Sequence, residues 1–416
     1  MTKPVRIAII GGGAAGMMAT ATINEKNSNA EVFLLEKNNE LGKKVIISGG
    51  GRCNVTTGLR DIGEVLQKYP RGAKFLRFAM HNFPPSDVMN WFEARGVPLK
   101  CEEDQRVFPV SDDGHDIVKV FKQIFSKNST SVLFNHSAIG IEKTNDEFII
   151  KLRQGEPLRV DRVILSLGGQ AYRHTGSTGD GYSLAESLGH RITALAPSLN
   201  SFITEEKWPR ILSGVSFERA TISTGGDQRQ TFTGPFLFTH TGISGPAVFA
   251  LSSLVAFTDY GAKKALPINI DLLPDYSAPK LLADLQTAMD NAPKKSLKNT
   301  IHLFVPLSVA EVICEQLAIP AEKKNAEISK QAVNAIVKRL KYLPLTVIGR
   351  GAGSEFVTAG GVELTEVNPR TMESKIVPGL FFAGEILNVD GFTGGFNLQA
   401  SWATGRLAGT NAAIID

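Results

Sequence analysis

The sequence predicts an α/β domain that is interrupted by inserted domains, and three observations support this prediction. The chain begins with an apolar strand, a glycine-rich turn and a helix. It ends with a second strand, glycine-rich loop and helix of the same kind. Between them, from about residue 193, short β-type segments and then helical segments replace the α/β pattern. We therefore expect the two ends of the chain to form one domain and the middle to be inserted into it.

The first segment is typical of a dinucleotide-binding βαβ unit. The apolar run Val5–Ile10 leads directly into Gly11-x-Gly13-x-x-Gly16 and a helix of small residues. Such glycines allow the backbone to approach a pyrophosphate, and the helix N-terminus presents N–H groups to it. The next apolar strand ends at Glu36, where a carboxylate can bind the hydroxyls of an adenosine ribose. The residues expected at this adenosine end are Gly11, Gly13, Ala15, Gly16, Glu36 and Lys37.

A glycine- and lysine-rich loop, Leu41–Gly58, follows the acidic residue. We expect it to run beside the pyrophosphate and the ring of the dinucleotide. A lysine there can neutralise phosphate or the charge of a reduced ring, and simple solvent exposure of Lys43 and Lys44 is the alternative. The contacts expected from this loop are Gly42, Lys43, Ser48, Gly49, Gly50 and Gly51. Further along, Phe134–Thr144 and Glu147–Leu152 predict a pair of strands. Val160–Leu167 predicts a buried strand that ends beside the dinucleotide in Gly168 and Gly169.

The C-terminal segment indicates which dinucleotide is bound. Gly379–Glu385 reads as an apolar strand, and the glycine-rich loop Asp390–Gly395 opens a helix over about residues 396–408. A helix start can place N–H groups beside a group that becomes anionic on reduction, as flavin N1–C2=O does. FAD fits both ends of the chain, whereas a nicotinamide dehydrogenase does not need this second half-site. The alternative to a flavin half-site is an ordinary strand–loop–helix unit that closes the α/β domain. The contacts expected here are Gly384, Glu385, Asp390, Gly395, Phe396, Asn397 and Leu398.

The middle of the chain predicts two inserted parts. Strand-like segments separated by turn residues predict a small barrel or sandwich, at Leu195–Ile203, Val215–Ser223, Gln230–Phe236 and Leu266–Ile270. Helical periodicity predicts an apolar helix at Ala247–Ala256 and a bundle at Lys280–Asn291, Ser308–Gln316 and Ser329–Leu340. The expected domains are an FAD-binding domain of residues 1–192 and 355–416, a β-barrel of residues 193–272 and 342–354, and a helical bundle of residues 273–341.

The composition is that of a soluble globular protein, with 43% hydrophobic and 21% charged residues. No apolar stretch has membrane-spanning length and no signal peptide is evident, so we expect a cytoplasmic protein. The three cysteines form no CxxC and the seven histidines show no metal-binding spacing, so we expect neither disulfides nor a metal site. The net charge is +4, and residues 260–345 hold twelve Lys or Arg against eight Asp or Glu. Solvent-exposed helix faces explain this excess of positive charge. A surface that binds nucleic acid is the more specific alternative.

Two short segments contain candidate catalytic side chains. Cys53 follows the Gly49–Gly51 turn, where its thiol could donate a proton during a reduction. Arg52 and Asn54 beside it could bind a carbonyl or a phosphate. A small buried residue is the alternative for Cys53. His240, in the run THTGISGP, is a second candidate as acid, base or substrate contact, with a structural role as its alternative.

The same motifs limit the electron donor. Only one GxGxxG pattern occurs, so we expect no permanent NADPH domain, and NAD(P)H would visit the flavin transiently. Without a CxxC, disulfide reduction is excluded.

Together these motifs resemble the HI0933-like flavoproteins, also known as aminoacetone-oxidase-like or BaiN-like FAD enzymes. The resemblance covers nearly the whole chain, and its most specific marks are GKKVIISGGGRCNVT and DGFTGGFNLQ. Further marks are SLGGQAYRHTGSTGDGY, LFTHTGISGPAV and TAGGV. The resemblance implies a glutathione-reductase-like Rossmann domain that binds FAD, interrupted by a small β-barrel and a helical bundle. Thr57, Asn388 and Asn200 depart from the pattern of the family, whereas the glycines of the flavin loops do not.

The resemblance also implies an activity. Similar proteins include a 23S rRNA dihydrouridine synthase and reductases of conjugated steroids, so the leading expectation is NAD(P)H-dependent reduction of a uridine in 23S rRNA. The basic inserted domains would hold RNA through its phosphates, and a uridine taken out of its stack would reach the flavin. The alternatives are a small-molecule ene-reductase or aminoacetone-type amine oxidase, and a flavin-binding ribosome partner without catalysis.

Overall fold

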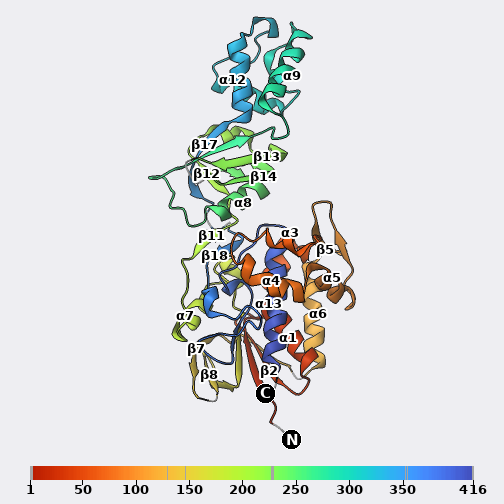
Figure 1. Cartoon of the computed structure of the whole chain (residues 1–416), viewed down its shortest axis with the longest axis vertical. Helices are drawn as coiled ribbons and strands as arrows, with labels where there is room; N and C mark the ends of the chain where they lie inside the picture. The colour runs from red at the N-terminus through yellow and green to blue at the C-terminus, as the bar shows by residue number, and fades with distance from the viewer. Residues whose placement is uncertain are drawn as a thin grey trace. The chain divides into compact units, whose positions relative to one another are not determined.

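The computed structural model describes residues 3–128, 130–145, 147–225, 229–351, 353 and 355–414. The chain forms two compact units. Unit 1 consists of Met1–Ser198 and Phe356–Asp416, and unit 2 is the continuous segment Leu199–Glu355 (Figure 1). Unit 2 contains both a barrel and a group of helices, for which the sequence predicts separate domains. Among the described residues, no helix is both long and apolar enough to cross a membrane.

Unit 1 is built on a five-stranded parallel sheet to which both ends of the chain contribute. In spatial order the strands are β19 (Leu380–Phe382), β10 (Arg162–Leu165), β1 (Arg6–Ile10), β2 (Glu31–Glu36) and β6 (Thr130–Phe134). All neighbouring strands are parallel, and β1 is buried along most of its length, as expected of a sheet covered on both faces. The predicted fold class is confirmed, because the first and last strands belong to one sheet.

The first and last helices pack against each other along small residues. α1 (Ala14–Lys26) and α13 (Phe396–Ala412) lie side by side in unit 1 (Figure 1). A Cβ added to Gly405 would lie 2.4 Å from the carbonyl oxygen of Ala15. A Cβ added to Gly409 would lie 2.5 Å from the carbonyl oxygen of Ala19, one turn further along α1. Because any side chain at these positions would meet backbone, the glycines permit the close approach of the two helices.

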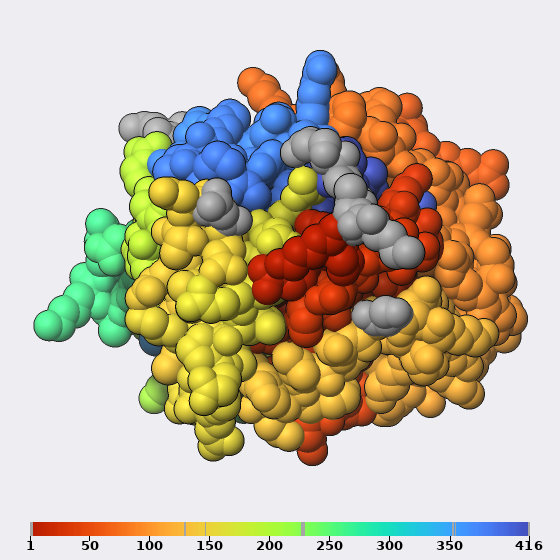
Figure 2. Space-filling model, turned by 90° about the horizontal axis from the view of Figure 1, so that it is seen from below, coloured from red at the N-terminus to blue at the C-terminus, as the bar shows by residue number. Residues whose placement is uncertain are grey.

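The remaining elements of unit 1 surround this core. The helices are α2 (Lys43–Ile47), α3 (Ile62–Leu66), α4 (Ala73–Asn82), α5 (Pro85–Glu93), α6 (Gly114–Lys127) and α7 (Asp180–Ser187). Two antiparallel sheets consist of β3 (Thr56–Thr57), β5 (Arg106–Pro109) and β4 (Leu99–Cys101), and of β7 (Ala138–Lys143), β8 (Phe148–Leu152) and β9 (Leu158–Val160). Figure 2 shows one face of unit 1, on which the red N-terminal segment borders the yellow segment that contains β10.

The chain leaves and re-enters unit 1 through a pair of short strands. β11 (Ala196–Ser198) precedes unit 2, β18 (Val357–Ala359) follows it, and the two pair antiparallel. We call β11 and β18 the crossing strands.

Two predicted strands are each divided by a residue with positive φ. The expected strand Phe134–Thr144 is interrupted at Asn135 (φ 59°): Phe134 is the last residue of β6, and the rest forms β7 in a different sheet. The expected strand Leu195–Ile203 is divided at Leu199 (φ 57°), which separates β11 from β12 (Phe202–Thr204). A residue in the left-handed region turns the chain out of the extended conformation, so neither strand continues through it.

Unit 2 contains the predicted barrel, which is closed and six-stranded. In spatial order it consists of β12, β15 (Gly242–Ser244), β14 (Thr231–Phe238), β13 (Ser216–Thr224), β16 (Leu266–Asp271) and β17 (Leu343–Arg350). All pairs are antiparallel, and β12 pairs with β17 to close the barrel. Helix α8 (Pro246–Leu254) packs on β14.

Four helices are inserted between β16 and β17. They are α9 (Ala278–Asp290), α10 (Leu297–Ile301), α11 (Leu307–Gln316) and α12 (Lys330–Lys341). α9 and α12 lie side by side (Figure 1). Their buried faces, including Leu285 and Val337, belong to the same hydrophobic cluster as barrel residues such as Phe236. Barrel and helices therefore share one core.

Candidate functional site

The N-terminal glycine turn has two crowded positions and one open position. A Cβ on Gly16 would lie 1.9 Å from the carbonyl oxygen of Gly11, and a Cβ on Gly11 (φ 108°) would lie 2.7 Å from that of Ser166. A Cβ on Gly13 would have no atom within 4 Å. Gly13 precedes α1, and no side chain caps the helix there. The turn is therefore packed tightly on the sheet and open at the start of the helix, as the approach of a pyrophosphate requires.

The acid at the end of β2 is held beside this turn. Glu36 Oε2 accepts a hydrogen bond from the N–H of Gly12 (2.9 Å), and Oε1 accepts from the backbone and side-chain N–H groups of Asn38 (2.8 and 2.7 Å). Lys37 next to it donates from Nζ to Asp180 Oδ2 at 2.7 Å. The carboxylate is thus fixed next to the glycine turn, whereas the neighbouring lysine is engaged with the first residue of α7.

The loop after α2 exposes bare backbone. Gly42 (φ 67°) precedes α2, and Lys43, its first residue, is half-buried. Ser48 then begins a turn in which Gly49–Gly51 all have positive φ, at 58°, 74° and 92°. A Cβ on either of the last two glycines would meet no atom within 4 Å. A planar ring or a phosphate can therefore approach this backbone closely.

The C-terminal glycine loop is held by a buried ion pair. Asp390 is fully buried, and its carboxylate forms a bidentate salt bridge with the guanidinium of Arg71. Ser198 Oγ donates to Asp390 Oδ2 at 2.8 Å. At the other end of the loop, the Asn397 amide accepts from the N–H of Gly391 and donates to its carbonyl, both at 2.8 Å. Asp390 and Asn397, which the sequence motifs assign to FAD contact, thus use their side chains to shape the loop.

The segment after the first glycine-rich loop lies against this second one. With its amide oriented to satisfy both neighbours, Asn54 accepts from the N–H of Gly395 (2.9 Å) and donates to the carbonyl of Thr56 (3.0 Å). Trp402 Nε1, in α13, donates to the carbonyl of Val55 at 2.9 Å, across 347 residues of sequence. Phe396 begins α13 in the core, and Leu398 is half-buried nearby. The two most specific sequence blocks therefore meet in space.

A second carboxylate joins three parts of unit 1. Glu385 Oε2 accepts from Lys44 Nζ at 2.6 Å, and Oε1 accepts from the N–H of Thr358 at 2.9 Å. A Cβ on Gly169 would lie 2.8 Å from Glu385 Oε1, and the preceding Gly168 has a φ of 73°. Helix α2, crossing strand β18 and the segment after β10 therefore converge on Glu385.

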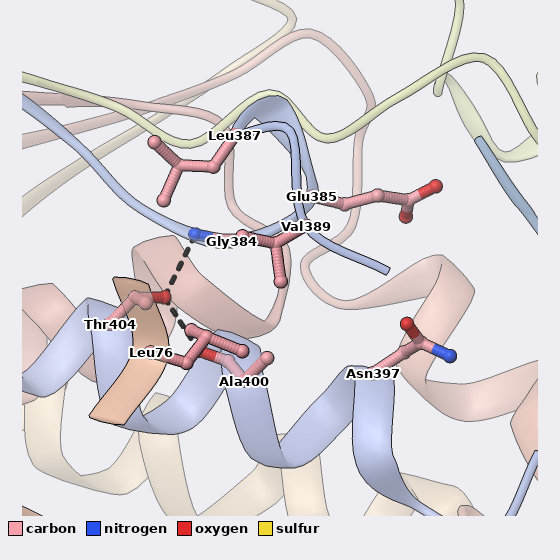
Figure 3. Close-up of a pocket in the computed structure, with 8 residues that line it drawn as sticks. All are labelled: Leu76, Gly384, Glu385, Leu387, Val389, Asn397, Ala400 and Thr404. Carbon is pink, nitrogen blue, oxygen red and sulfur yellow. Dashed lines mark hydrogen bonds between the residues drawn. The ribbon is translucent and has the colours of Figure 1, made fainter. Parts of the chain in front are cut away.

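A small pocket lies between the segment Gly384–Val389 and helix α13 (Figure 3). Its lining residues are Leu76, Gly384, Glu385, Leu387, Val389, Asn397, Ala400 and Thr404. The N–H of Gly384 donates to Thr404 Oγ1 at 2.9 Å, and this hydroxyl donates to the carbonyl of Ala400 at 2.6 Å. The pocket has room for about one water molecule. The pocket is therefore too small to be a substrate cavity.

Three of the candidate catalytic residues, Arg52, Cys53 and Asn54, are held in place by neighbouring groups. The Cys53 side chain is fully buried, and burial raises the pKa of its thiol to about 12. A thiol that is inaccessible and this weakly acidic is poorly placed to protonate a substrate, so the geometry favours the packing alternative. Arg52 Nη1 lies 2.7 Å from Glu102 Oε1, and its guanidinium lies 3.8 Å from the centre of the Phe108 ring. The side chains of Arg52 and Asn54 are therefore both engaged by other protein groups.

His240 belongs to unit 2, whereas the other three candidates belong to unit 1. It lies in the tight turn between β14 and β15, where the N–H of Thr239 donates to the carbonyl of Gly242 at 2.9 Å. Its side chain is exposed. Of the four candidates, His240 has the most accessible side chain.

Sequence reasoning missed the residues that hold the two carboxylates. These are Lys44, Arg71, Ser198 and Thr358. Thr358 lies in TAGGV, which marks the family but suggests no role, and Arg71 lies in a turn without any motif. Their partners are remote in sequence, so no local pattern could reveal them. Within the part of the chain that the structure describes, no group of three His, Cys, Asp or Glu could hold a metal ion.

Comparison with known proteins agrees with this geometry. Residues 5–411 match the family described as HI0933-like protein Rossmann domain. The 3-dehydro-bile acid delta(4,6)-reductase of Clostridium scindens is 30% identical over 98% of this chain and 99% of its own length. The ribosomal RNA dihydrouridine synthases of Haemophilus influenzae and Escherichia coli are 30% and 28% identical, over 95% of this chain and 95% of their own.

Solved structures of other proteins share the fold. The open conformation of a flavocytochrome c3 fumarate reductase has a TM-score of 0.51 at 16% identity and covers 99% of this chain and 78% of its own. The 3-ketosteroid delta1-dehydrogenase of Sterolibacterium denitrificans has a TM-score of 0.51 at 13% identity and covers 99% and 100%. Glycine turns that are open at Gly13, Gly50 and Gly51, together with an uncapped helix start, fit a bound dinucleotide. The chain belongs to the HI0933-like family and is an FAD-dependent oxidoreductase.

Proposed function

We propose that the protein reduces a C=C bond conjugated to a carbonyl, in a uridine of 23S rRNA, with NAD(P)H as the electron donor. The reaction class is supported by the names of three relatives that match over nearly their whole length, a delta(4,6)-reductase and two dihydrouridine synthases. FAD, when bound and reduced by NAD(P)H, would supply a hydride to the electron-poor carbon of the double bond. A proton reaches the neighbouring carbon, and NAD(P)H is oxidised to NAD(P)⁺, so the substrate gains two hydrogens in all.

The two halves of unit 1 would hold FAD. The Gly11–Gly16 turn and the start of α1 would bind the pyrophosphate, and Glu36 the adenosine ribose. The exposed backbone of Gly49–Gly51 would lie beside the flavin ring. The start of α13, which Asn54 fixes through Gly395, would place N–H groups at the end of the ring that becomes anionic.

We propose His240 as the first residue to test as proton donor. Its imidazole is exposed, and histidine is the side chain that most often serves as a general acid in enzymes. The His240→Gln variant is expected to bind FAD and to be reduced by NAD(P)H normally, but to form product at least about 100-fold more slowly. Cys53→Ser is the matched control, because the Cys53 thiol is buried. Loss of activity in the Cys53 variant alone would reverse the assignment.

A cluster of lysines in the helices of unit 2 carries the proposal of an RNA substrate. The lysine cluster consists of Lys294, Lys295, Lys323 and Lys324, and all but the half-buried Lys323 are exposed. Two loops are joined to form it: Leu297 N–H donates to Lys323 O at 2.9 Å, and Asn325 N–H donates to Lys295 O at 3.0 Å.

The loops of the lysine cluster are also fixed from inside. Asn325 is buried, and its side-chain amide donates to the carbonyl of Ala292 and to Thr300 Oγ1, both at 2.8 Å. The fold therefore brings the four lysines together on two joined loops, from which their side chains would reach phosphates.

The substrate is tested by measuring dihydrouridine in 23S rRNA by mass spectrometry, with and without the gene, and then with purified protein, NADPH and unmodified rRNA. Loss of one dihydrouridine and its restoration by the protein are expected. An unchanged rRNA in both assays would overturn the RNA substrate. Flavin that NAD(P)H reduces no faster than background would indicate a flavin-binding partner without catalysis.

The contribution of the lysine cluster is tested by charge reversal. Lys295→Glu/Lys324→Glu is expected to weaken rRNA binding and to lower the slope of log K against log salt by about 0.7 to 0.9 for each phosphate that the variant no longer neutralises. Lys119→Glu/Lys127→Glu, on the exposed face of α6 in unit 1, changes the charge equally and serves as the control. Equal effects of both pairs would reject the lysine cluster as the RNA surface.

A conjugated steroid is the second candidate substrate. It is favoured by the Clostridium scindens relative, which is as similar to this chain as the Haemophilus influenzae synthase. A steroid enone would be turned over at a rate that hardly depends on salt, and the charge-reversed pair would retain full activity toward it.

A further inference from the structure

Both crossing strands are bound to the C-terminal half-site. β11 carries the chain out of unit 1 and β18 carries it back. Each strand donates a hydrogen bond to a carboxylate of the segment Glu385–Gly395, in which the flavin is proposed to bind. The carboxylates are Glu385 and Asp390, and both are neutralised by a cation from another part of unit 1.

The outgoing strand is bound through a side chain. Ser198, the last residue of unit 1 before the crossing, donates from Oγ to Asp390 Oδ2 at 2.8 Å. Arg71 pairs with the same carboxylate, and its Nη2 lies 3.5 Å from Ser198 Oγ. Ser198 and Asp390 are both fully buried, so water does not compete for this bond.

The returning strand is bound through its backbone. The N–H of Thr358 donates to Glu385 Oε1 at 2.9 Å, while Lys44 holds Oε2 at 2.6 Å. Thr358 Oγ1 in turn accepts from the N–H of Gln170 at 2.7 Å. The strand is thus fixed on one side to Glu385 and on the other to the segment that follows β10.

The two glycines of TAGGV complete the arrangement. A Cβ on Gly360 would lie 2.0 Å from the carbonyl of Ala194, just before β11, and a Cβ on Gly361 would lie 2.5 Å from the carbonyl of Ile386. Both glycines have positive φ, at 92° and 151°. The returning chain therefore lies between the outgoing chain and the C-terminal half-site with no space for side chains.

We propose that Ser198 and Thr358 are positioning residues that couple FAD binding to the crossing strands. The inference rests on the proposed place of FAD beside Glu385–Gly395. FAD that orders this segment also orders both crossings, and by thermodynamic reciprocity a loosened crossing weakens FAD binding by the same factor. The protein without FAD has looser connections between its units than the protein with FAD.

Hydrogen–deuterium exchange of the full chain, with and without FAD, tests the coupling. FAD is expected to slow exchange in peptides that cover residues 193–201 and 355–362. In Ser198→Ala the slowing is expected to be lost at 193–201. Thr358→Val keeps the backbone bond to Glu385 but removes the Oγ1 acceptor of the Gln170 N–H, so the slowing at 355–362 is expected to be reduced. Each variant is expected to weaken FAD binding by about two- to tenfold, which is the part of one buried hydrogen bond that is realised only with FAD bound.

Thr22→Val is the matched control. Thr22 is fully buried in α1 and donates from Oγ1 to the carbonyl of Met18 at 2.8 Å, so its loss removes a hydroxyl bond away from the crossings. The control is expected to lose stability but to keep FAD-dependent slowing at both peptides. Slowing that is unchanged from wild type in both test variants, or that is absent from the wild-type protein with FAD bound, would overturn the coupling. Failure of the wild-type protein to bind FAD would instead overturn the proposed cofactor site.

Discussion

The two glycine loops of unit 1 are maintained in different ways. The N-terminal loop, Gly11–Gly16, is shaped by backbone: its crowded glycines meet the carbonyls of Gly11 and Ser166. The C-terminal loop, Asp390–Gly395, is shaped by side chains that come from Asn54, Arg71, Ser198 and Asn397.

This difference determines what can break each loop. The N-terminal loop depends on the absence of side chains, so an added methyl group is its main hazard. The C-terminal loop depends on polar groups from distant segments, so the removal of a single polar side chain is its main hazard. Variants of the two kinds therefore test the comparison directly.

The largest effect is expected from Gly16→Ala. Its Cβ would lie 1.9 Å from the carbonyl oxygen of Gly11 and 2.7 Å from Ser166 Oγ, and the Gly11 backbone cannot yield without distorting the turn. We expect the free energy of unfolding to fall by about 4 kcal/mol or more, or folding to fail. Chemical denaturation followed by circular dichroism measures this. A loss below about 1 kcal/mol would contradict the crowded geometry of the turn.

The next effect is expected from Asp390→Ala. The variant leaves the guanidinium of Arg71 without its buried partner, which costs about 3–5 kcal/mol. The double variant Arg71→Met/Asp390→Ala removes both charges and is expected to recover part of that loss. Strictly additive losses in the denaturation midpoint would argue against the ion pair as the support of the loop.

A smaller effect is expected from Asn397→Ala. The Asn397 amide makes two hydrogen bonds to Gly391, and its removal leaves both backbone groups without that partner. A loss of about 1–3 kcal/mol in unfolding free energy is expected, together with weaker FAD binding. Thermal unfolding with and without FAD separates the two. An unchanged FAD affinity would show that the loop keeps its shape without this side chain.

The smallest effect on stability is expected from Gly13→Ala. A Cβ there meets no atom, and the φ of −80° suits alanine, so unfolding free energy is expected to change by no more than about 1 kcal/mol. FAD affinity is nevertheless expected to fall by about tenfold or more, since the methyl group would occupy the space of the pyrophosphate. Isothermal titration of the apoprotein measures this. Undiminished affinity would move the pyrophosphate away from Gly13.

The comparison also explains how far sequence reasoning could reach. The N-terminal turn was predictable because strand, glycines, helix and acid follow one another within Val5–Glu36. The joining of β1 and β19 in one sheet was predictable from the likeness of the two ends. The roles of Asp390 and Asn397 were not, because their partners are fixed by tertiary contacts such as the one with Arg71.

Other limits of prediction were local. The thiol of Cys53 follows a glycine turn, but the sequence does not say that it points into the core. The expected strands were interrupted at Asn135 and Leu199, where single residues take positive φ. Asparagine adopts this conformation readily, whereas leucine does so at a cost, so the second interruption carried no compositional signal.

The close packing of α1 on α13 at Gly405 and Gly409 affects the order in which the protein can fold. α1 is synthesised before unit 2 and α13 after it, so the nascent Rossmann domain lacks both β19 and the helix that packs on α1 while unit 2 is being made. Unit 2 is continuous in sequence and has its own core, so it is free to fold first. Strand β10 is meanwhile without the partner that β19 later provides. Unit 1 can therefore be completed only after α13 has been synthesised.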